Sequence, residues 1–553
     1  MLLFSLFDSL EGSLPLYLLL PLLCITASVQ SVQDFTIYRI QHLDIHGSHI
    51  GSRSAVVNME ARSPEAAMLN RKCVLIKWTE LTSDLFNELL ERGAGAVLII
   101  LPNDWRNNDN NNNTLHEWML LEKELMSREI SIPVYLTTES EYLNEVYDKL
   151  TSSVDWDSSA AAALFSSITG EGYSLIADAV EPVPIINPEI TTIIGKLSGQ
   201  GYESELPTVV MTTHYDSFGL APGLASSGDS GGSGVAAILE LARLFSNLYS
   251  NPHHKPKYNL LFVLTGADNF NYFGTKYFIE DMLEDADGYL LSEADYTLCL
   301  DALAGGSDIF LHVSRPPKEG TKGQELVARM NESLSLVAGL SSVTLNHKKI
   351  RIGDDALAWS HERFSLHKVP AGTLSHFSHH SDIRRKSMFH TSTDVDGLSA
   401  SVQLIAESVV RHILPEINEM DNYTSGIFTG QMSVHTDSLQ SWLNYLSQTG
   451  RSQQSLLNKD HPLLLSLQQT LSSYVHEVST FTHKPDKSDP EFVIYTQSVS
   501  IMHSYSVKPA VLDLVLAISI LLYMGGVYLL VMYFSNISQL INDVKYRVKA
   551  KRD

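Results

Sequence analysis

The sequence VVMTTHYDSFGLAPGLASSGDSGGSGVAAILELARLF, from Val209 to Phe245, predicts a strand, a loop and a helix in immediate succession. The apolar run at its start has the length and composition of a buried parallel strand. His214 and Asp216 stand where that strand would end, and the Gly/Ser-rich loop that follows carries Asp229. The later apolar residues recur at three- and four-residue intervals and predict one face of an amphipathic helix. Because ligands bind at the carboxyl ends of strands in open α/β sheets, we expect a site here.

More polar residues follow the next predicted strands. The apolar run LLFVLT precedes Asp268 and Asn269, a third short run precedes Asp301, and His390 lies further along the chain. A His-x-Asp alone is more often a histidine bonded to a loop carboxylate than part of a site. The full succession of His, Asp, a paired position, Asp and His is more specific. Over residues 185–414 it resembles the two-zinc aminopeptidase and glutamate carboxypeptidase family.

The resemblance assigns a role to each of these positions. In that family two zinc ions share a bridging carboxylate, and a neighbouring glutamate deprotonates the water that attacks the peptide. By resemblance Asp229 would be the bridge, and His214 and Asp301 would hold one ion. His390 and the second residue of a Glu-Glu pair would hold the other ion.

The Glu-Glu pair is replaced here by Asp268 and Asn269. An amide cannot supply the negative charge of a metal ligand, and an aspartate is one methylene too short for the general base. A displacement of roughly 1 Å can cost on the order of a hundredfold in rate. We therefore expect a peptidase fold with a decayed site, no catalytic residue and no bound metal. A single residual zinc on His214, Asp229 and Asp301 is the alternative.

Composition limits the class of protein. The chain has 553 residues, 44% hydrophobic and 18% charged, which fits two or three globular domains. A net charge of -24 argues against binding to nucleic acid and against general adsorption to anionic lipid. Cys24 lies in the N-terminal apolar segment. Cys73 and Cys299 lie in different predicted domains, so we expect both to be free buried thiols.

Two regions precede the peptidase-like part. Residues 1–33 contain LPLYLLLPLLC followed by small residues, which is typical of a signal peptide, with an uncleaved anchor as the second choice. Residues 34–165 predict a lumenal α/β module with strands at 71–77, 96–101 and 132–136. Its phrase GAGAVLIILP resembles the protease-associated domain.

The rest of the chain divides into four parts. Residues 166–415 predict the aminopeptidase-like lumenal domain, a mixed α/β sheet flanked by helices. Residues 416–509 turn polar and predict a juxtamembrane helical collar. Residues 510–534 predict a transmembrane helix, because 21 residues from 514 to 534 carry no charge. Residues 535–553 predict a basic cytosolic tail.

The charge asymmetry around the predicted span indicates a single-pass type I protein with its bulk in the lumen. Sequons at Asn112, Asn331 and Asn422 all precede the span and would then be glycosylation candidates. Lys549 and Lys551 in the tail resemble the dilysine retrieval signal of endoplasmic reticulum membrane proteins. A basic cluster that binds anionic lipid is the alternative.

Nearly the whole chain resembles the nicalin family, whose members are relatives of nicastrin. The resemblance rests on HYDSFGLAP, GDSGGSGVAAILELARLF, YNLLFVLTG, FNYFGTK, HVSRPPKEGT, WSHERF and DPEFV before VKPAVLDL. It implies a non-catalytic scaffold in the endoplasmic reticulum membrane. The implied partners are a Nomo-like lumenal protein and a small multi-pass membrane protein, near the Sec translocon and ribosome, in multi-pass membrane protein biogenesis. The alternatives are a membrane-tethered zinc aminopeptidase and a nicastrin-like receptor for free amino ends.

Overall fold

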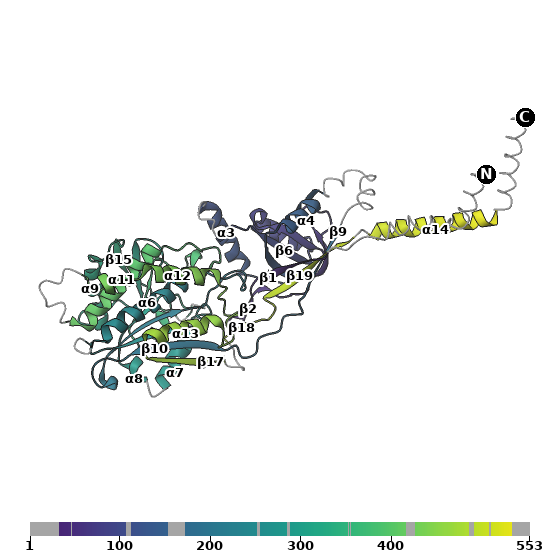
Figure 1. Cartoon of the computed structure of the whole chain (residues 1–553). Helices are drawn as coiled ribbons and strands as arrows, with labels where there is room; N and C mark the ends of the chain where they lie inside the picture. Colours follow the sequence, from purple (N-terminus) through teal and green to yellow (C-terminus); the bar gives the residue numbers. More distant parts are fainter. Residues whose placement is uncertain are drawn as a thin grey trace, which may run out of the picture.

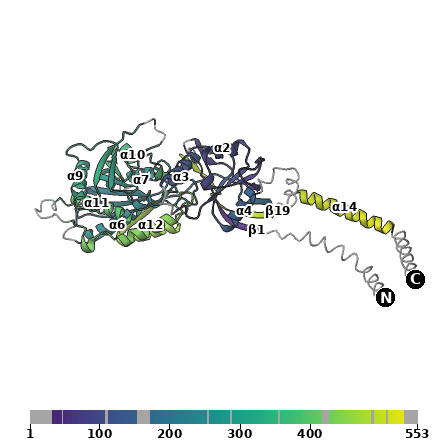
Figure 2. The same ribbon diagram turned by 90° about the horizontal axis from the view of Figure 1, so that it is seen from above.

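The computed structural model describes residues 32–45, 47–106, 112–152, 172–251, 255–284, 288–351, 353, 356–415, 426–485, 491–507 and 510–533. Most of the predicted signal or anchor, Cys24, the sequon at Asn422 and the tail with Lys549 and Lys551 lie outside these ranges. Two domains lie side by side, and helix α14 extends away from them (Figures 1 and 2).

A mixed sheet of eight strands forms the larger domain, in the order β15-β14-β16-β13-β11-β12-β10-β17. The strands are β10 (Ile190–Leu197), β11 (Thr208–His214), β12 (Asn259–Thr265), β13 (Ala294–Leu300), β14 (Asp308–Val313), β15 (Ser342–His347), β16 (Ala371–Ser375) and β17 (Glu477–His483). The central strands β12, β11, β13 and β16 are parallel, whereas β10 and β17 are antiparallel to their neighbours. The predicted mixed sheet and its three successive site strands are confirmed.

Helices cover both faces of this sheet. One face carries α6 (Gly232–Tyr249), α9 (Lys322–Leu334), α11 (Val395–Ile413), α12 (Thr436–Gln448) and α13 (Pro462–Tyr474). The other carries α7 (Phe273–Glu284), α8 (Tyr289–Ser292) and α10 (His361–Leu366). Alternate residues of β11 point to opposite faces of the sheet. Val209 and Met211 pack with α6, and Val210 packs toward α7. Burial on both faces explains why this strand is continuously apolar.

The smaller domain is a closed barrel in the order β1-β19-β9-β4-β5-β6-β8. Its strands are β1 (Val32–Arg39), β4 (Asn58–Arg62), β5 (Cys73–Lys77), β6 (Ala96–Leu101), β8 (Val134–Thr138), β9 (Gly172–Ala177) and β19 (Val499–Val507). Its helices are α2 (Ser83–Glu91), α3 (Asn112–Leu125) and α4 (Glu141–Ser152). The three expected strands are present as β5, β6 and β8, and α2 lies between the first two in the sequence. Cys73 and Cys299 are free and buried, as predicted.

The segment expected to be a helical collar differs from that expectation. Its helices α12 and α13 are present, but it also contributes β17 to the large sheet and β19 to the barrel. A third sheet, in the order β18-β2-β3-β7, takes β18 (Phe492–Ile494) from the same segment and joins it to β2 (His42–Ile45), β3 (Ser48–Ser52) and β7 (Glu129–Ile130). The collar prediction missed these strands, because each of them pairs with a segment far away in the chain: β17 with β10, β18 with β2, and β19 with β1 and β9. The chain therefore returns to its N-terminal domain.

The two domains share a hydrophobic core. Phe389, from the loop before α11, packs against Trp78, Trp105 and Trp118 of the barrel domain at ring-centroid distances of 4.9, 5.9 and 5.6 Å. Leu220, from the loop after β11, belongs to the same cluster. Two of the loops that carry predicted metal-ligand positions, those of Asp229 and His390, are thus anchored in the barrel domain.

Helix α14 (Ala510–Met532) overlaps most of the apolar segment predicted to span a membrane. Among the residues that the structure describes, no helix combines the length and the apolarity that crossing a membrane requires.

Candidate functional site

His214 and Asp301 meet at the carboxyl ends of the parallel neighbours β11 and β13, as the sequence predicts. His214 Nε2 lies 3.6 Å from Asp301 Oδ1, and His214 Nδ1 lies 2.9 Å from the backbone oxygen of Asp216. Burial acts to lower the pKa of His214, but the carboxylates of Asp216 and Asp301 outweigh it and raise the pKa to about 10. His214 is therefore an imidazolium held between two carboxylates.

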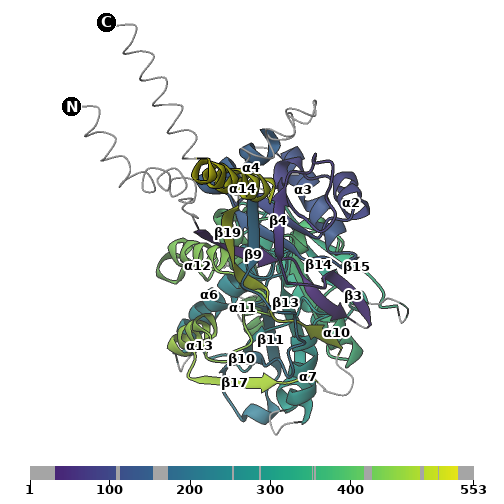
Figure 3. The same cartoon turned by 90° about the vertical axis from the view of Figure 1, so that its right-hand side faces the viewer.

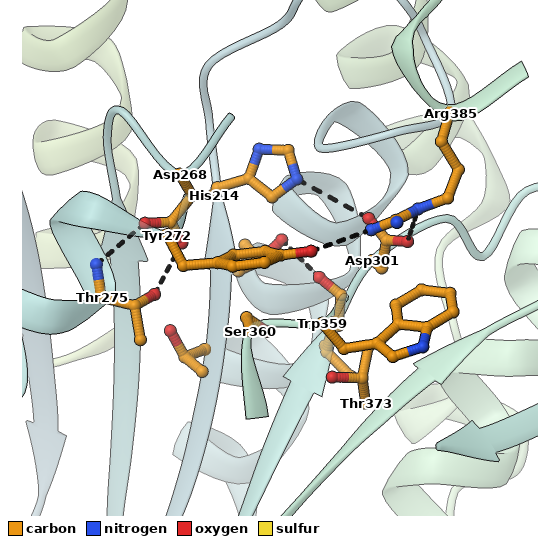
Figure 4. A pocket seen from close by; sticks show the side chains of 12 residues that line it. His214, Asp268, Tyr272, Thr275, Asp301, Trp359, Ser360, Thr373 and Arg385 are labelled. Atoms are coloured by element: carbon orange, nitrogen blue, oxygen red, sulfur yellow. Dashed lines mark hydrogen bonds and ion pairs between the residues drawn. The ribbon is translucent and has the colours of Figure 1, made fainter. Parts of the chain in front are cut away.

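Asp301 is also paired with an arginine that the sequence analysis did not identify. Arg385 Nε donates to Asp301 Oδ2 across 3.0 Å (Figure 4). The guanidinium stacks 4.1 Å over the ring of Trp359 and donates to the hydroxyl of Tyr272. Burial acts to raise the pKa of Asp301, but Arg385 and His214 hold it well below its usual range. Arg385 thus places a permanent positive charge beside a predicted zinc ligand.

Asp229, the predicted bridging ligand, has its own histidine partner. Its Oδ2 lies 2.6 Å from His376 Nε2, and its Oδ1 accepts from the backbone N–H of Ala304 at 2.9 Å. Ser233, the second residue of α6, donates to Oδ1 at 3.0 Å. Both carboxylate oxygens of Asp229 are therefore engaged within the protein.

The loop between Asp229 and α6 must pass close to His214. Gly231 has a φ of 72°, and a Cβ added to it would lie 2.7 Å from His214 Cε1. Only glycine meets both demands without strain. The glycine-rich stretch in the opening motif is therefore explained by backbone approach.

The pair at positions 268 and 269 serves local structure. Asp268 accepts hydrogen bonds from Thr265 Oγ1 at 2.8 Å and from the N–H and Oγ1 of Thr275 at 2.8 and 2.6 Å. Asn269 Nδ2 donates to Asp216 Oδ2 at 3.0 Å. Burial raises the pKa of Asp268. Asp268 binds the first turn of α7, and the amide of Asn269 makes a bond to Asp216 that a glutamate at this position could not donate.

His390 lies beside these residues but makes fewer hydrogen bonds through its side chain. Its side chain is buried, and its Nδ1 has no hydrogen-bond partner among the described residues. Burial lowers its pKa, although Asp229 acts in the opposite direction. The structure thus brings His214, Asp229, Asp268, Asn269, Asp301 and His390 to one end of the sheet.

The charges around the predicted ligand positions differ from those of a zinc centre. Within the described ranges, no group of three or more His, Cys, Asp and Glu side chains is arranged to hold a metal ion. Zinc binds neutral imidazole and ionised carboxylate. Here His214 lies between the carboxylates of Asp216 and Asp301, Asp301 faces a guanidinium, and Asp229 faces His376.

The space at this site is small. The cavity lies among the ends of β11, β12 and β13 and measures about 10 Å³. Its lining includes His214, Asp268, Tyr272, Asp301 and Arg385 (Figure 4). A volume of this size holds about one water molecule.

A second arginine, also missed by the sequence analysis, holds the loop that follows β11. Arg451 is fully buried and donates to the backbone oxygens of Tyr215 at 2.6 Å, Leu446 at 3.1 Å and Ser227. It follows α12, more than 200 residues further along the chain. Nothing local in the sequence distinguishes it from a surface arginine. The run IRRK before His390 was a better signal for Arg385, because charge there adjoins a predicted ligand.

Comparison with known proteins identifies a peptidase family and a solved structure that resemble this fold. Residues 192–402 match Peptidase family M28. The solved structure of the gamma-secretase component nicastrin aligns with a TM-score of 0.58 at 10% identity, covering 85% of this chain and 99% of that one. The fold and site therefore define a peptidase-like α/β protein in which the predicted ligand positions Asp229 and Asp301 face cationic or imidazole side chains of the same chain.

Curated relatives resemble the chain over almost its whole length. BOS complex subunit ncln of Danio rerio is 38% identical over 548 residues, covering 95% of each chain. BOS complex subunit NCLN of Homo sapiens is 37% identical over 529 residues, covering 95% of this chain and 93% of the relative. Nicalin of Caenorhabditis elegans is 28% identical over 398 residues, covering 69% of each. The chain belongs to the nicalin family.

Proposed function

We propose that this protein is a non-catalytic scaffold subunit of a membrane complex, built on a peptidase fold whose metal site has been replaced by internal ion pairs. The observation that carries the proposal is the contact of 3.0 Å between Arg385 and Asp301. A guanidinium is always charged and provides locally the compensation that a metal ion would otherwise provide. The pair of His376 with Asp229 supports the same conclusion at the predicted bridging position.

The finer assignment rests on the family. Relatives are named subunits of the BOS complex, which supports assembly with other chains. We extend this to a Nomo-like lumenal protein and a small multi-pass membrane protein, near the Sec translocon and ribosome, in multi-pass membrane protein biogenesis. The proposed location is the endoplasmic reticulum membrane, in single-pass type I orientation. The uncharged run at residues 514–534 supports the membrane span.

The test of the non-catalytic role uses the full chain purified in mild detergent. We expect zinc well below one per chain by inductively coupled plasma mass spectrometry, and no hydrolysis of a panel of aminoacyl and acidic dipeptide substrates. Zinc near two per chain, with turnover abolished by Asp229→Asn, would make the protein an aminopeptidase instead. One zinc without turnover would contradict the proposed replacement of the metal site.

A matched pair of variants distinguishes two reasons why zinc would not bind: the loss of the Glu-Glu pair, and the side chains that occupy Asp301 and Asp229. Asp268→Glu with Asn269→Glu restores only the ligand pair. Adding Arg385→Ala and His376→Ala to it also removes the side chains that occupy Asp301 and Asp229. We expect zinc uptake only in the fourfold variant, because Arg385 and His376 would still hold Asp301 and Asp229 in the double variant. Uptake by the double variant would show that the Glu-Glu pair alone had been lost.

A further inference from the structure

We propose that the free edge of strand β17 binds an extended strand of a partner protein, one rich in basic residues with an apolar residue among them. The proposal rests on the scaffold role above and names the surface that would serve it. Strand addition to an exposed sheet edge is a recurrent mode of recognition, in which backbone hydrogen bonds give affinity and side-chain pockets give specificity.

Strand β17 is the last strand of the large sheet. It pairs with β10 from Ile190↔His483 to Lys196↔Glu477, and no described strand pairs with its other side. Figure 3 shows it at the border of the sheet, beyond β10. Among the described residues, its backbone makes no hydrogen bond outside this ladder. Four of its seven residues, Glu477, Ser479, Thr480 and Thr482, are exposed.

The sequence of β17 does not protect this edge. Natural edge strands are usually blunted by lysine, proline, a bulge or a covering element. β17 reads EVSTFTH, with no lysine and no proline, and its register with β10 is unbroken over seven pairs. An edge of this length and regularity without such protection fits a strand that is covered in the assembled protein.

A small apolar crevice lies on the α7 side of the edge. It is lined by residues of β10, α7 and β17: Thr192, Ile194, Phe278, Asp281, Met282 and Phe481. Phe481 is the only aromatic residue of β17, and it is half-buried. A strand added beside β17 would direct alternate side chains toward α7. One of those side chains would be apolar and would pack against Phe481.

The charge around the edge is acidic. Helix α7 carries Glu280, Asp281 and Glu284, and Asp281 lies against His483 of β17. The lysines nearby already face carboxylates: Lys276 of α7 pairs with Glu491, and Lys484, directly after β17, pairs with Glu189. Glu477 begins β17 and shares Lys196 with Glu203. An added strand would therefore be attracted if it carried lysine or arginine.

The opposite edge of the same sheet is a natural control. β15 is also unpaired on its outer side among the described strands. The residues that follow it are basic, namely Lys348, Lys349 and Arg351. A basic strand would be repelled there, so the two edges of one sheet make opposite predictions.

The experiment places a photo-crosslinking residue, p-benzoylphenylalanine, in the full chain in native membranes. It replaces Ser479 or Thr480 at the β17 edge, and Thr344 on β15 as the control. We expect crosslinks to a different polypeptide at the β17 positions, in severalfold higher yield than at Thr344, with the attached residues mapped by mass spectrometry to a basic extended segment. Amides of β17 should exchange hydrogen severalfold more slowly in the complex than in the dissociated chain.

Other results would overturn the proposal. They include equal yields at both edges, attachment to an acidic or helical segment, attachment to a second copy of this chain, or unprotected β17 amides. Thr482→Lys gives a milder check that leaves the ladder to β10 in place, and it should reduce the crosslink severalfold, because an added edge lysine disfavours a basic strand. Full zinc and peptidase activity would refute the scaffold role itself, whereas loss of the crosslink in an intact complex would refute only this surface.

Discussion

Arg385 Nε lies 3.0 Å from Asp301 Oδ2, so a predicted zinc ligand is bound by an arginine of its own chain. The same carboxylate lies 3.6 Å from the imidazolium of His214 through its other oxygen. Asp301 is buried and bears a negative charge that two cations compensate. The site is stable as an ion-pair network, and this network can be tested by substitution.

Arg385→Ala should destabilise the protein strongly. Removing one partner of a buried ion pair leaves an uncompensated charge and costs about 3–5 kcal/mol. We expect a fall of that size in the free energy of unfolding, measured by urea denaturation followed by tryptophan fluorescence. Arg384→Ala is the matched control, because its side chain is 45% exposed and pairs with Asp382 at the surface. A loss below about 1 kcal/mol is expected there, and equal effects of the two variants would contradict the role of Arg385.

Arg451→Met should also destabilise, for a different reason. The methionine keeps much of the side-chain volume but removes the donors to the backbone oxygens of Tyr215, Ser227 and Leu446. Each buried acceptor left unsatisfied costs about 1–3 kcal/mol. Lys322→Met, an exposed change on α9, is the control. A thermal shift no larger than that of the control would show that water can replace the guanidinium.

Glu122 predicts a pH dependence of stability at the domain interface. Its buried carboxylate accepts from the backbone N–H groups of Leu220 at 2.8 Å and Met388 at 3.1 Å, and from the hydroxyl of Ser387. Burial raises the pKa of Glu122 to about 7, although these hydrogen bonds oppose the shift. The folded state therefore binds an extra proton above the usual pKa of glutamate.

The direction of the pH dependence follows from this difference in proton binding between the folded and unfolded states. The stabilising contribution of Glu122 is complete below about pH 4.5 and is lost as the pH rises to about 7, by up to about 3 kcal/mol. Glu122→Gln should remove this part of the slope of unfolding free energy against pH. Glu124→Gln, in the same helix, is the control. An unchanged slope in Glu122→Gln would assign the dependence to other groups.

Phe389→Ala should weaken the junction between the two domains. The ring packs among Trp78, Trp105 and Trp118, and its loss leaves a cavity in the shared core. A buried phenylalanine replaced by alanine costs about 3–5 kcal/mol. We expect a lower unfolding midpoint and faster proteolysis of the loop at 387–390. Leu366→Ala, whose side chain is exposed, should change neither, and the prediction fails if Phe389→Ala behaves like it.

Asn331 offers a test of the proposed lumenal orientation. It lies exposed on α9, so an attached glycan would meet no packing obstacle. Asn331→Gln should abolish one glycosidase-sensitive step in gel mobility, whereas Glu332→Gln, which preserves the sequon, should not. Resistance of the wild-type protein to glycosidase at Asn112, Asn331 and Asn422 together would contradict the orientation.

The sequence by itself determined the large sheet and the position of the site. The apolar runs before His214, Asp268 and Asp301 are buried parallel strands, and strand ends of a parallel sheet converge on one edge. The replacement of a Glu-Glu pair by Asp268 and Asn269 was also visible without coordinates. These features are local in the chain, and hydrophobic period and residue chemistry are enough to reveal them.

Only the tertiary structure decided what the site residues bind. Arg385 reaches Asp301, His376 reaches Asp229 and Arg451 reaches Tyr215 across separations of 84, 147 and 236 residues. The same is true of β17 and β19, whose pairing partners β10, β1 and β9 lie far earlier in the chain. Such contacts depend on how distant segments pack. A sequence pattern reports the residues that a segment buries, but it does not report the distant side chain that will pair with them.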